Sequence, residues 1–227
     1  MSVHPAAMPY KIDGVLPPGL LTEVDTGTNL LVSGPAMSGK RQLLLELLAR
    51  GSSEGEGSVV VTSRHPAEDV VADYLEAAAS DDPGHFRVID CVSSHSGATA
   101  EDTRVHEVSS PGDLTGIGIE FSEIAREAEA AGVARLRVGF DSLSPLLMYV
   151  DLQRLFRFLH VFTSQIQSRD WFGLFAIDPD SHDAQEVNTI SQLFDGMIEI
   201  RLADGGGREV RVRGVTDSPT DWTPLDE

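Results

Sequence analysis

The segment Leu30–Leu48, with the sequence LLVSGPAMSGKRQLLLELL, joins a short apolar strand to a leucine-rich helix through a glycine-containing loop. The loop from Gly34 to Lys40 fits the phosphate-binding pattern G-x-x-x-x-G-K. In this pattern, backbone N–H groups surround one point at the N-terminus of the helix, and the lysine adds a full positive charge. The segment therefore predicts a site for the phosphates of a nucleotide.

The predicted nucleotide site comprises the loop and the residue after it. These residues are Gly34, Pro35, Ala36, Met37, Ser38, Gly39, Lys40 and Arg41. Arg41 stands where the pattern has Ser or Thr, whose hydroxyl contacts magnesium. The sequence leaves two placements open. The guanidinium either reaches the phosphates and partly replaces the metal, since arginine suits bidentate contacts with oxyanions, or lies on the helix surface.

A second strand ends in an aspartate. Residues 135–140 (RLRVGF) form an apolar run that delivers Asp141 to the C-terminal end of the predicted strand. Beside a phosphate-binding loop, such an aspartate orders magnesium and its waters. The alternative is that Asp141 caps the helix that follows. Together with the Lys40 loop, Asp141 is our candidate magnesium ligand.

The rest of the chain alternates strand-like and helix-like segments, which predicts an α/β fold with a mostly parallel central sheet and helices on both faces. Expected strands are 29–33, 58–62, 86–92, 104–109, 135–140 and 172–177, and expected helices are 40–50, 66–79, 119–131, 145–169 and 184–193. Residues 51–57 are expected to be a flexible connector and 93–103 a mobile polar loop. Residues 196–202 and 209–213 are expected to pair as an antiparallel hairpin.

A length of 227 residues is compatible with one large domain. We expect an irregular N-terminal segment over residues 1–13, a single domain over 14–215 and an acidic tail over 216–227. No apolar run approaches the roughly 20 residues of a membrane span. The single cysteine, Cys91, excludes an internal disulfide and suits a reducing cytoplasm.

The charge balance is strongly acidic, with 36 acidic against 17 basic residues and a formal net charge of −19. Such a surface repels nucleic acid phosphates, which argues against a nucleic acid partner. The carboxylates are spread along the chain, which is typical of the solvated surface of a halophile's protein. Only two of the basic residues are lysines, Lys11 and Lys40, and one of them lies in the loop.

The order of these segments resembles the RecA-type ATPases, in particular the KaiC-like and GvpD-like archaeal family. The segments that carry the resemblance are VSGPAMSGK, SVVVTSRHPAED, RLRVGFDSLSPLL and FDGMIEIRL with REVRVRG, which span most of residues 14–215. The resemblance implies a RecA-like fold with ATP or ADP, and magnesium, at the C-terminal edge of the sheet. The acidity and the scarcity of lysine resemble a haloarchaeal member.

The sequence departs from this family at a catalytic position. KaiC-like ATPases carry an acidic pair after the second core strand, where this chain has Ser63 and Arg64. A missing general base commonly costs about 10²–10⁴-fold in rate. Asp113 is a candidate substitute base, or else a cap of the following helix. The departures favour nucleotide binding with weak or absent hydrolysis.

Arg211 and Arg213 lie two residues apart and therefore on one face of a strand. The resemblance implies that such residues contact the nucleotide of a neighbouring subunit. The alternative is a solvated edge strand whose charges prevent edge-to-edge pairing.

These features lead to one hypothesis and two alternatives. The hypothesis is a cytoplasmic nucleotide-binding protein that acts as a regulatory or assembly component, with a homo-oligomer or another protein as partner. The alternatives are an active ATPase that remodels a partner and a scaffold or signalling module that no longer binds nucleotide. The biological pathway, the nucleotide base and the oligomeric state stay open.

Overall fold

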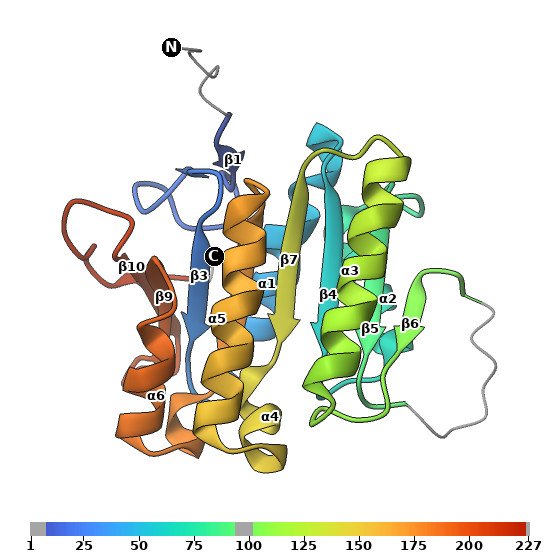
Figure 1. Cartoon of the computed structure of the whole chain (residues 1–227). Coiled ribbons are helices and arrows are strands. Elements are labelled where there is room, and N and C mark those ends of the chain that lie inside the picture. The colour runs from blue at the N-terminus through green and yellow to red at the C-terminus, as the bar shows by residue number, and fades with distance from the viewer. Residues whose placement is uncertain (1–7, 94–101, 226–227) are drawn as a thin grey trace, which may run out of the picture.

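A computed structural model of the chain describes residues 8–93 and 102–225 (Figure 1). The segment 94–101, which makes up most of the predicted mobile loop, lies outside the described residues, as do residues 1–7 and 226–227. Within the described part, no helix combines the length and the apolar character needed to cross a membrane.

The fold is built on a nine-stranded sheet with the order β11-β10-β9-β3-β8-β7-β4-β5-β6. The strands from β9 to β6 in this order pair in parallel, whereas β10 pairs antiparallel with both β9 and β11. Their bounds are β3 (Asn29–Ser33), β4 (Gly57–Thr62), β5 (Phe86–Asp90), β6 (Val105–Glu107), β7 (Leu136–Asp141), β8 (Phe172–Ile177), β9 (Gly196–Leu202), β10 (Arg208–Arg213) and β11 (Thr223–Pro224). The predicted fold class and the C-terminal hairpin are confirmed.

Helices cover both faces of this sheet, and Figure 1 shows α3 and α5 in front of it with α1 and α2 behind. One apolar cluster contains α1 (Lys40–Ala49) and α2 (Ala67–Ala78). The other contains α3 (Leu114–Ala130), α4 (Leu143–Tyr149), α5 (Leu152–Ser168) and α6 (Ala184–Ser191). Because both faces are covered, β3, β4, β7 and β8 are buried along their whole length, which explains their continuous apolar runs.

One predicted element is wrong. The expected helix over residues 145–169 is two helices, because Val150 and Asp151 adopt extended backbone conformations between α4 and α5. The Asp151 carboxylate accepts a hydrogen bond of 2.8 Å from the N–H of Arg154 and so caps α5. An aspartate at this position competes with helix continuation, since its side chain satisfies an N–H that has no partner within the helix.

Residues outside the predicted limits 14–215 also take part in the fold. Tyr10–Lys11 forms β1, which pairs with β2 (Glu23–Val24), and the Tyr10 side chain is buried in the core. At the other end, β11 extends the main sheet. The predicted connector at 51–57 holds a short 3₁₀ helix, η1 (Ser52–Glu54), followed by the buried Glu56.

A buried ion pair holds the N-terminal end of β7, at the end of the strands opposite the loop. The Glu56 carboxylate accepts a hydrogen bond of 2.6 Å from Arg137 Nε, and the Arg137 side chain is fully buried. Arg137 also donates to the carbonyl oxygens of Leu47 and Lys11, at 2.6 and 2.7 Å. The second carboxylate oxygen of Glu56 accepts from Arg135 Nε at 2.8 Å. Arg137 therefore ties β7 to α1 and to the N-terminal segment, and Glu56 neutralises its buried charge.

Replacing Glu56 by alanine is expected to destabilise the protein by about 3–5 kcal/mol, because Arg137 would be left buried without its partner. Denaturant unfolding at fixed ionic strength measures the change. The matched control is Glu54→Ala, which removes an exposed carboxylate from the same segment and should change the free energy of unfolding little. Equal effects of the two variants would contradict the role assigned to Glu56.

Candidate functional site

The loop between β3 and α1 has the backbone of an anion-binding turn. Met37 and Gly39 both adopt left-handed conformations, with φ angles of 60° and 79°. Gly39 caps α1 and has no side chain to occupy the first-turn N–H groups. A Cβ atom at Gly34 would lie 2.7 Å from Ser38 Oγ, so glycine is needed there for the loop to close. The sequence pattern at 34–39 thus corresponds to a compact loop at a helix N-terminus, where an anion is favoured.

The Lys40 side chain lies across the loop. Its ammonium donates a hydrogen bond of 2.8 Å to the carbonyl oxygen of Pro35 and lies 4.0 Å from Asp178 Oδ2. Only 9% of the Lys40 side chain is exposed. Burial lowers the pKa of Lys40 below its ordinary 10.5, and the Asp178 carboxylate opposes this shift. The ammonium is therefore poorly solvated and positioned to gain from a nearby anion.

Arg41 is turned inward, not toward the exposed surface of α1. Its Nε donates to Asp141 Oδ2 at 3.0 Å, and its Nη1 pairs with the Asp73 carboxylate on α2. The Asp141 side chain is 4% exposed. Burial raises the pKa of Asp141, and the Arg41 guanidinium opposes this shift. Arg41 thus joins α1 to the end of β7 and to α2.

Two buried polar atoms of this region have no hydrogen-bond partner among the described residues. They are Ser38 Oγ in the loop and Arg41 Nη2 at the start of α1. Ser38 is fully buried. Buried donors and acceptors are nearly always paired, so these two atoms are open hydrogen-bonding positions beside the loop.

Asp178 is a site residue that our sequence analysis missed. It follows β8, which lies between β3 and β7 in the sheet, and it is buried. The signal was present, because FGLFAI at 172–177 is an apolar strand ending in an aspartate, as is the strand before Asp141. The Asp178 carboxylate also accepts an N–H of Asp180 at 3.2 Å and caps the 3₁₀ helix η2 (Pro179–Ser181).

Ser63 and Arg64 have different roles at the end of β4. The Ser63 hydroxyl is buried and donates to the carbonyl oxygen of Ser142 at 2.6 Å, which links the ends of β4 and β7. Arg64 lines a pocket of about 520 Å³ together with Ala36 of the loop and Asp178. Its charge is close enough to lower the pKa of Lys40 further. Arg64 therefore adds a second positive charge near Lys40.

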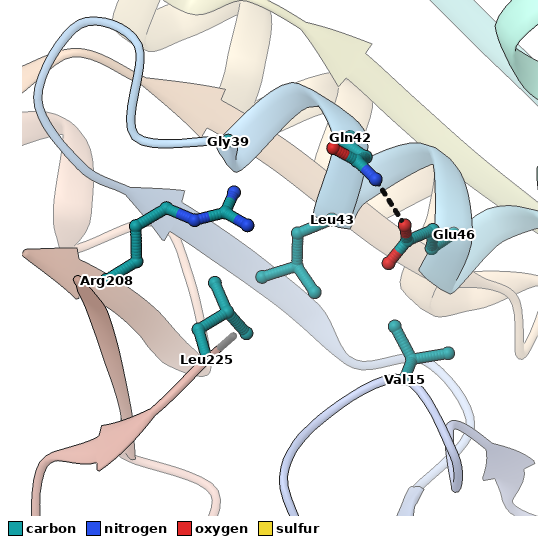
Figure 2. Close-up of a pocket in the computed structure, with 7 residues that line it drawn as sticks. All are labelled: Val15, Gly39, Gln42, Leu43, Glu46, Arg208 and Leu225. Atoms are coloured by element: carbon teal, nitrogen blue, oxygen red, sulfur yellow. Dashed lines mark hydrogen bonds between the residues drawn. The ribbon is translucent and has the colours of Figure 1, made fainter. Parts of the chain in front are cut away.

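A second pocket, of about 370 Å³, adjoins the other side of the loop (Figure 2). Its lining residues are Val15, Gly39, Gln42, Leu43, Glu46, Arg208 and Leu225. Figure 2 shows the Arg208 guanidinium reaching from β10 toward Gly39, and any side chain at Gly39 would collide with it. Gln42 Nε2 donates to Glu46 Oε1 at 2.9 Å along the first turns of α1.

A family model matches residues 27–200 of the chain, and its description is a family of unknown function, DUF7504. The chain belongs to this family. The match includes the whole loop, Asp141 and Asp178. No curated protein matches the sequence.

The fold is similar to that in the crystal structure of a KaiC-like protein from the hyperthermophilic archaeon Pyrococcus horikoshii OT3. The similarity has a TM-score of 0.61, covers 94% of this chain and 88% of that chain, and accompanies 14% sequence identity. This DUF7504 member therefore has a RecA/KaiC-like fold, as the resemblance in the motifs implied.

Asp113, the candidate substitute base, caps α3. Its carboxylate accepts the N–H of Gly116 at 2.8 Å and the Ser109 hydroxyl at 2.9 Å. These hydrogen bonds lower the pKa of Asp113, the Gly116 N–H most. The residue follows the edge strand β6, and β5, β4, β7 and β8 separate that strand from β3. The structure thus shows the capping alternative and keeps Asp113 apart from Lys40.

Arg211 and Arg213 both pair with Glu199 on the neighbouring strand β9. Arg211 Nε lies 2.5 Å and Arg213 Nη2 lies 3.4 Å from the Glu199 carboxylate. The Arg211 guanidinium also lies over the Trp222 ring, 4.5 Å from its centroid. Contact with a neighbouring subunit's nucleotide stays a prediction, and it would require these arginines to leave Glu199.

The chain's two lysines allow Lys40 to be observed directly. With carbon-13 label in the lysine Cε, we expect one signal, identified by its loss in Lys40→Met, to titrate below 10.5 because burial disfavours the charged ammonium. Titration by NMR up to about pH 11 measures this. A Lys40 signal that titrates at or above 10.5 in the protein without nucleotide would contradict the buried ammonium.

Proposed function

We propose that this protein binds a nucleotide, ATP or ADP, hydrolyses it weakly or not at all, and acts as a regulatory or assembly component. The observation that carries the proposal is the Lys40 ammonium, which is buried at the N-terminus of α1, donates a hydrogen bond to the Pro35 carbonyl oxygen and has its nearest carboxylate, Asp178, at 4.0 Å among the described residues. An anion at this point would receive both a full charge and helix N–H groups.

Phosphate oxygens would supply the hydrogen-bond acceptors and the negative charge that this region lacks. They accept hydrogen bonds, as the unpaired Nη2 of Arg41 and hydroxyl of Ser38 require. They would also relieve the desolvation of Lys40 by supplying opposite charge. In a chain of net charge −19, three cations, Lys40, Arg41 and Arg64, lie near the C-terminal ends of β3, β7 and β4, and this supports an anionic ligand.

The two pockets beside the loop support a ligand larger than phosphate. The pocket of about 370 Å³ offers Leu43 and Leu225 as apolar contacts, and Gln42 and Glu46 as hydrogen-bonding groups. A base and ribose require this mixture of surfaces. We assign this pocket to the nucleoside part of the ligand.

The position after β4 supports weak or absent hydrolysis. The Ser63 hydroxyl is hydrogen-bonded to the Ser142 backbone, and Arg64 carries a guanidinium. Neither side chain is a carboxylate that could orient or deprotonate water. Asp113 is too far along the sheet to substitute. Loss of a general base alone reduces rate by about 10²–10⁴-fold.

A regulatory role draws support from the link between the loop and the hairpin. Arg208 belongs to β10 but lies against Gly39, so a ligand in the pocket would contact both elements. A bound ligand could then favour one arrangement of the hairpin. Arg211 and Arg213 on this hairpin would contact a partner protein or a second copy of this chain. The acidic surface and single cysteine support a cytoplasmic, halophilic and archaeal setting.

One observation favours a second candidate function, a working ATPase. Asp178 is a buried carboxylate that lines the pocket of about 520 Å³ and lies near the Lys40 ammonium. It could accept a proton from an attacking water. Its capping of η2 and its position beside Lys40 argue for a positioning role instead.

ATP is expected to raise the melting temperature, because a ligand that binds only the folded state stabilises it by mass action. Lys40→Ala should remove this shift, whereas Lys11→Ala, at the chain's only other lysine, should retain it. Thermal unfolding monitored by circular dichroism, in concentrated KCl and with ATP varied, provides the measurement. An unchanged melting temperature for the wild-type protein, with no heat of binding in calorimetry, would refute nucleotide binding.

Steady-state phosphate release by the wild-type protein is expected to match that of Lys40→Ala, because Ser63 and Arg64 occupy the position after β4 where a general base is expected. A malachite green assay over several hours measures it. Asp178→Asn separates the two candidate functions. Release that exceeds the Lys40→Ala level and is lost in Asp178→Asn, with ATP binding retained, would establish the ATPase and overturn the proposal of weak hydrolysis.

A further inference from the structure

The residues that would hold magnesium in this fold do not fit the ion. Mg²⁺ requires oxygen ligands at short distances in octahedral geometry. Position 41 supplies a guanidinium instead of a hydroxyl, and the Asp141 carboxylate already pairs with Arg41 Nε at 3.0 Å. Within residues 8–93 and 102–225, no group of three or more His, Cys, Asp or Glu side chains could hold a metal ion.

Arg41 is held in this position from two sides. Asp141 at the end of β7 binds its Nε, and Asp73 on α2 binds its Nη1. Because the guanidinium is planar and its donors are fixed relative to one another, these two contacts also fix the direction of Nη2. A divalent cation could reach Asp141 only by displacing this guanidinium or by lying beside it, and both are electrostatically unfavourable.

Arg41 has a donor left over. Its Nη2 is buried and has no acceptor among the described residues, although leaving a buried donor unpaired is energetically unfavourable. Ser38 Oγ, which faces Gly34 across the loop, is the second unpaired atom. These atoms flank Lys40 in the chain, and both can donate to an oxyanion. An anionic oxygen would satisfy them, whereas a metal ion would not.

We propose that this site binds the phosphate chain of a nucleotide without a divalent cation, with the Arg41 guanidinium taking the place of magnesium. The inference rests on the proposed nucleotide binding and specifies the form of the ligand, which is free ATP or ADP. Arg41 contributes charge-assisted hydrogen bonds to the phosphate oxygens, and Arg64 adds charge at the same edge of the sheet.

Calorimetric titration with ATP, in excess EDTA or in excess Mg²⁺ at equal ionic strength, tests this. The wild-type protein is expected to bind ATP at least as tightly in EDTA as in Mg²⁺, since magnesium competes with the protein for the phosphates. Binding in EDTA that is about tenfold or more weaker than in Mg²⁺ would overturn the inference but leave nucleotide binding intact. Absence of binding under both conditions would instead refute the proposed function.

Arg41→Ser restores the hydroxyl of the pattern and should reverse the metal dependence. In EDTA its affinity should fall by about tenfold or more, because charge-assisted hydrogen bonds are lost, and Mg²⁺ should recover part of the loss. Arg126→Ser is the matched control, since it makes the same substitution at an exposed arginine of α3 and should keep ATP binding independent of metal. An Arg41→Ser variant whose affinity in EDTA equals that of the wild type would contradict the role of Arg41.

A second measurement needs no variant. Mn²⁺ bound to ATP gives a weak electron paramagnetic resonance signal, whereas free Mn²⁺ gives a strong six-line spectrum. If the protein takes up metal-free ATP, its addition to Mn-ATP should release Mn²⁺ and increase the six-line signal. A decrease, or no change under conditions where calorimetry shows binding, would mean that the metal enters with the nucleotide and that the inference is wrong.

Discussion

Parallel pairing of β3 with β8, of β8 with β7 and of β7 with β4 is the constraint on which the site depends. Parallel strands place their C-terminal ends at one edge of the sheet, so the residues that follow them must lie near one another. The loop at 34–40, Asp178, Asp141 and Ser63 follow these four strands, in that order across the sheet. The site is therefore a consequence of strand order.

The charged residues of the site have different roles. The chain is strongly acidic, yet Lys40, Arg41 and Arg64 lie near one another close to the N-terminus of α1. Asp141 and Asp178 hold two of these cations in place. A cation that is both buried and paired retains a fixed geometry, which favours an oxyanion with matching acceptors over a diffuse counterion atmosphere. The Glu56–Arg137 pair at the opposite edge plays a purely structural part, tying β7 to α1 and the N-terminal segment.

Much of the fold was accessible from the sequence, because buried parallel strands are short apolar runs and helices repeat with a different period. The errors have local causes. The helix expected at 145–169 is interrupted at Asp151, which caps α5. An aspartate can cap a helix only where the chain before the helix is extended, and the sequence does not show this. Asp178 was missed although its strand resembles that of Asp141, because no motif marks it and only the position of β8 beside β3 gives it a role.

By itself, the sequence determined the strand, loop and helix around Lys40, since a left-handed glycine and a close backbone approach restrict which residues can occupy 34–40. It also determined the excess of negative charge and the absence of a carboxylate at Ser63–Arg64. Only the tertiary structure decided that Arg41 points inward to Asp141, that Asp113 caps a helix and that Arg211 pairs with Glu199. The direction of a long or charged side chain is set by partners from distant segments, and those partners become neighbours only when the sheet has formed.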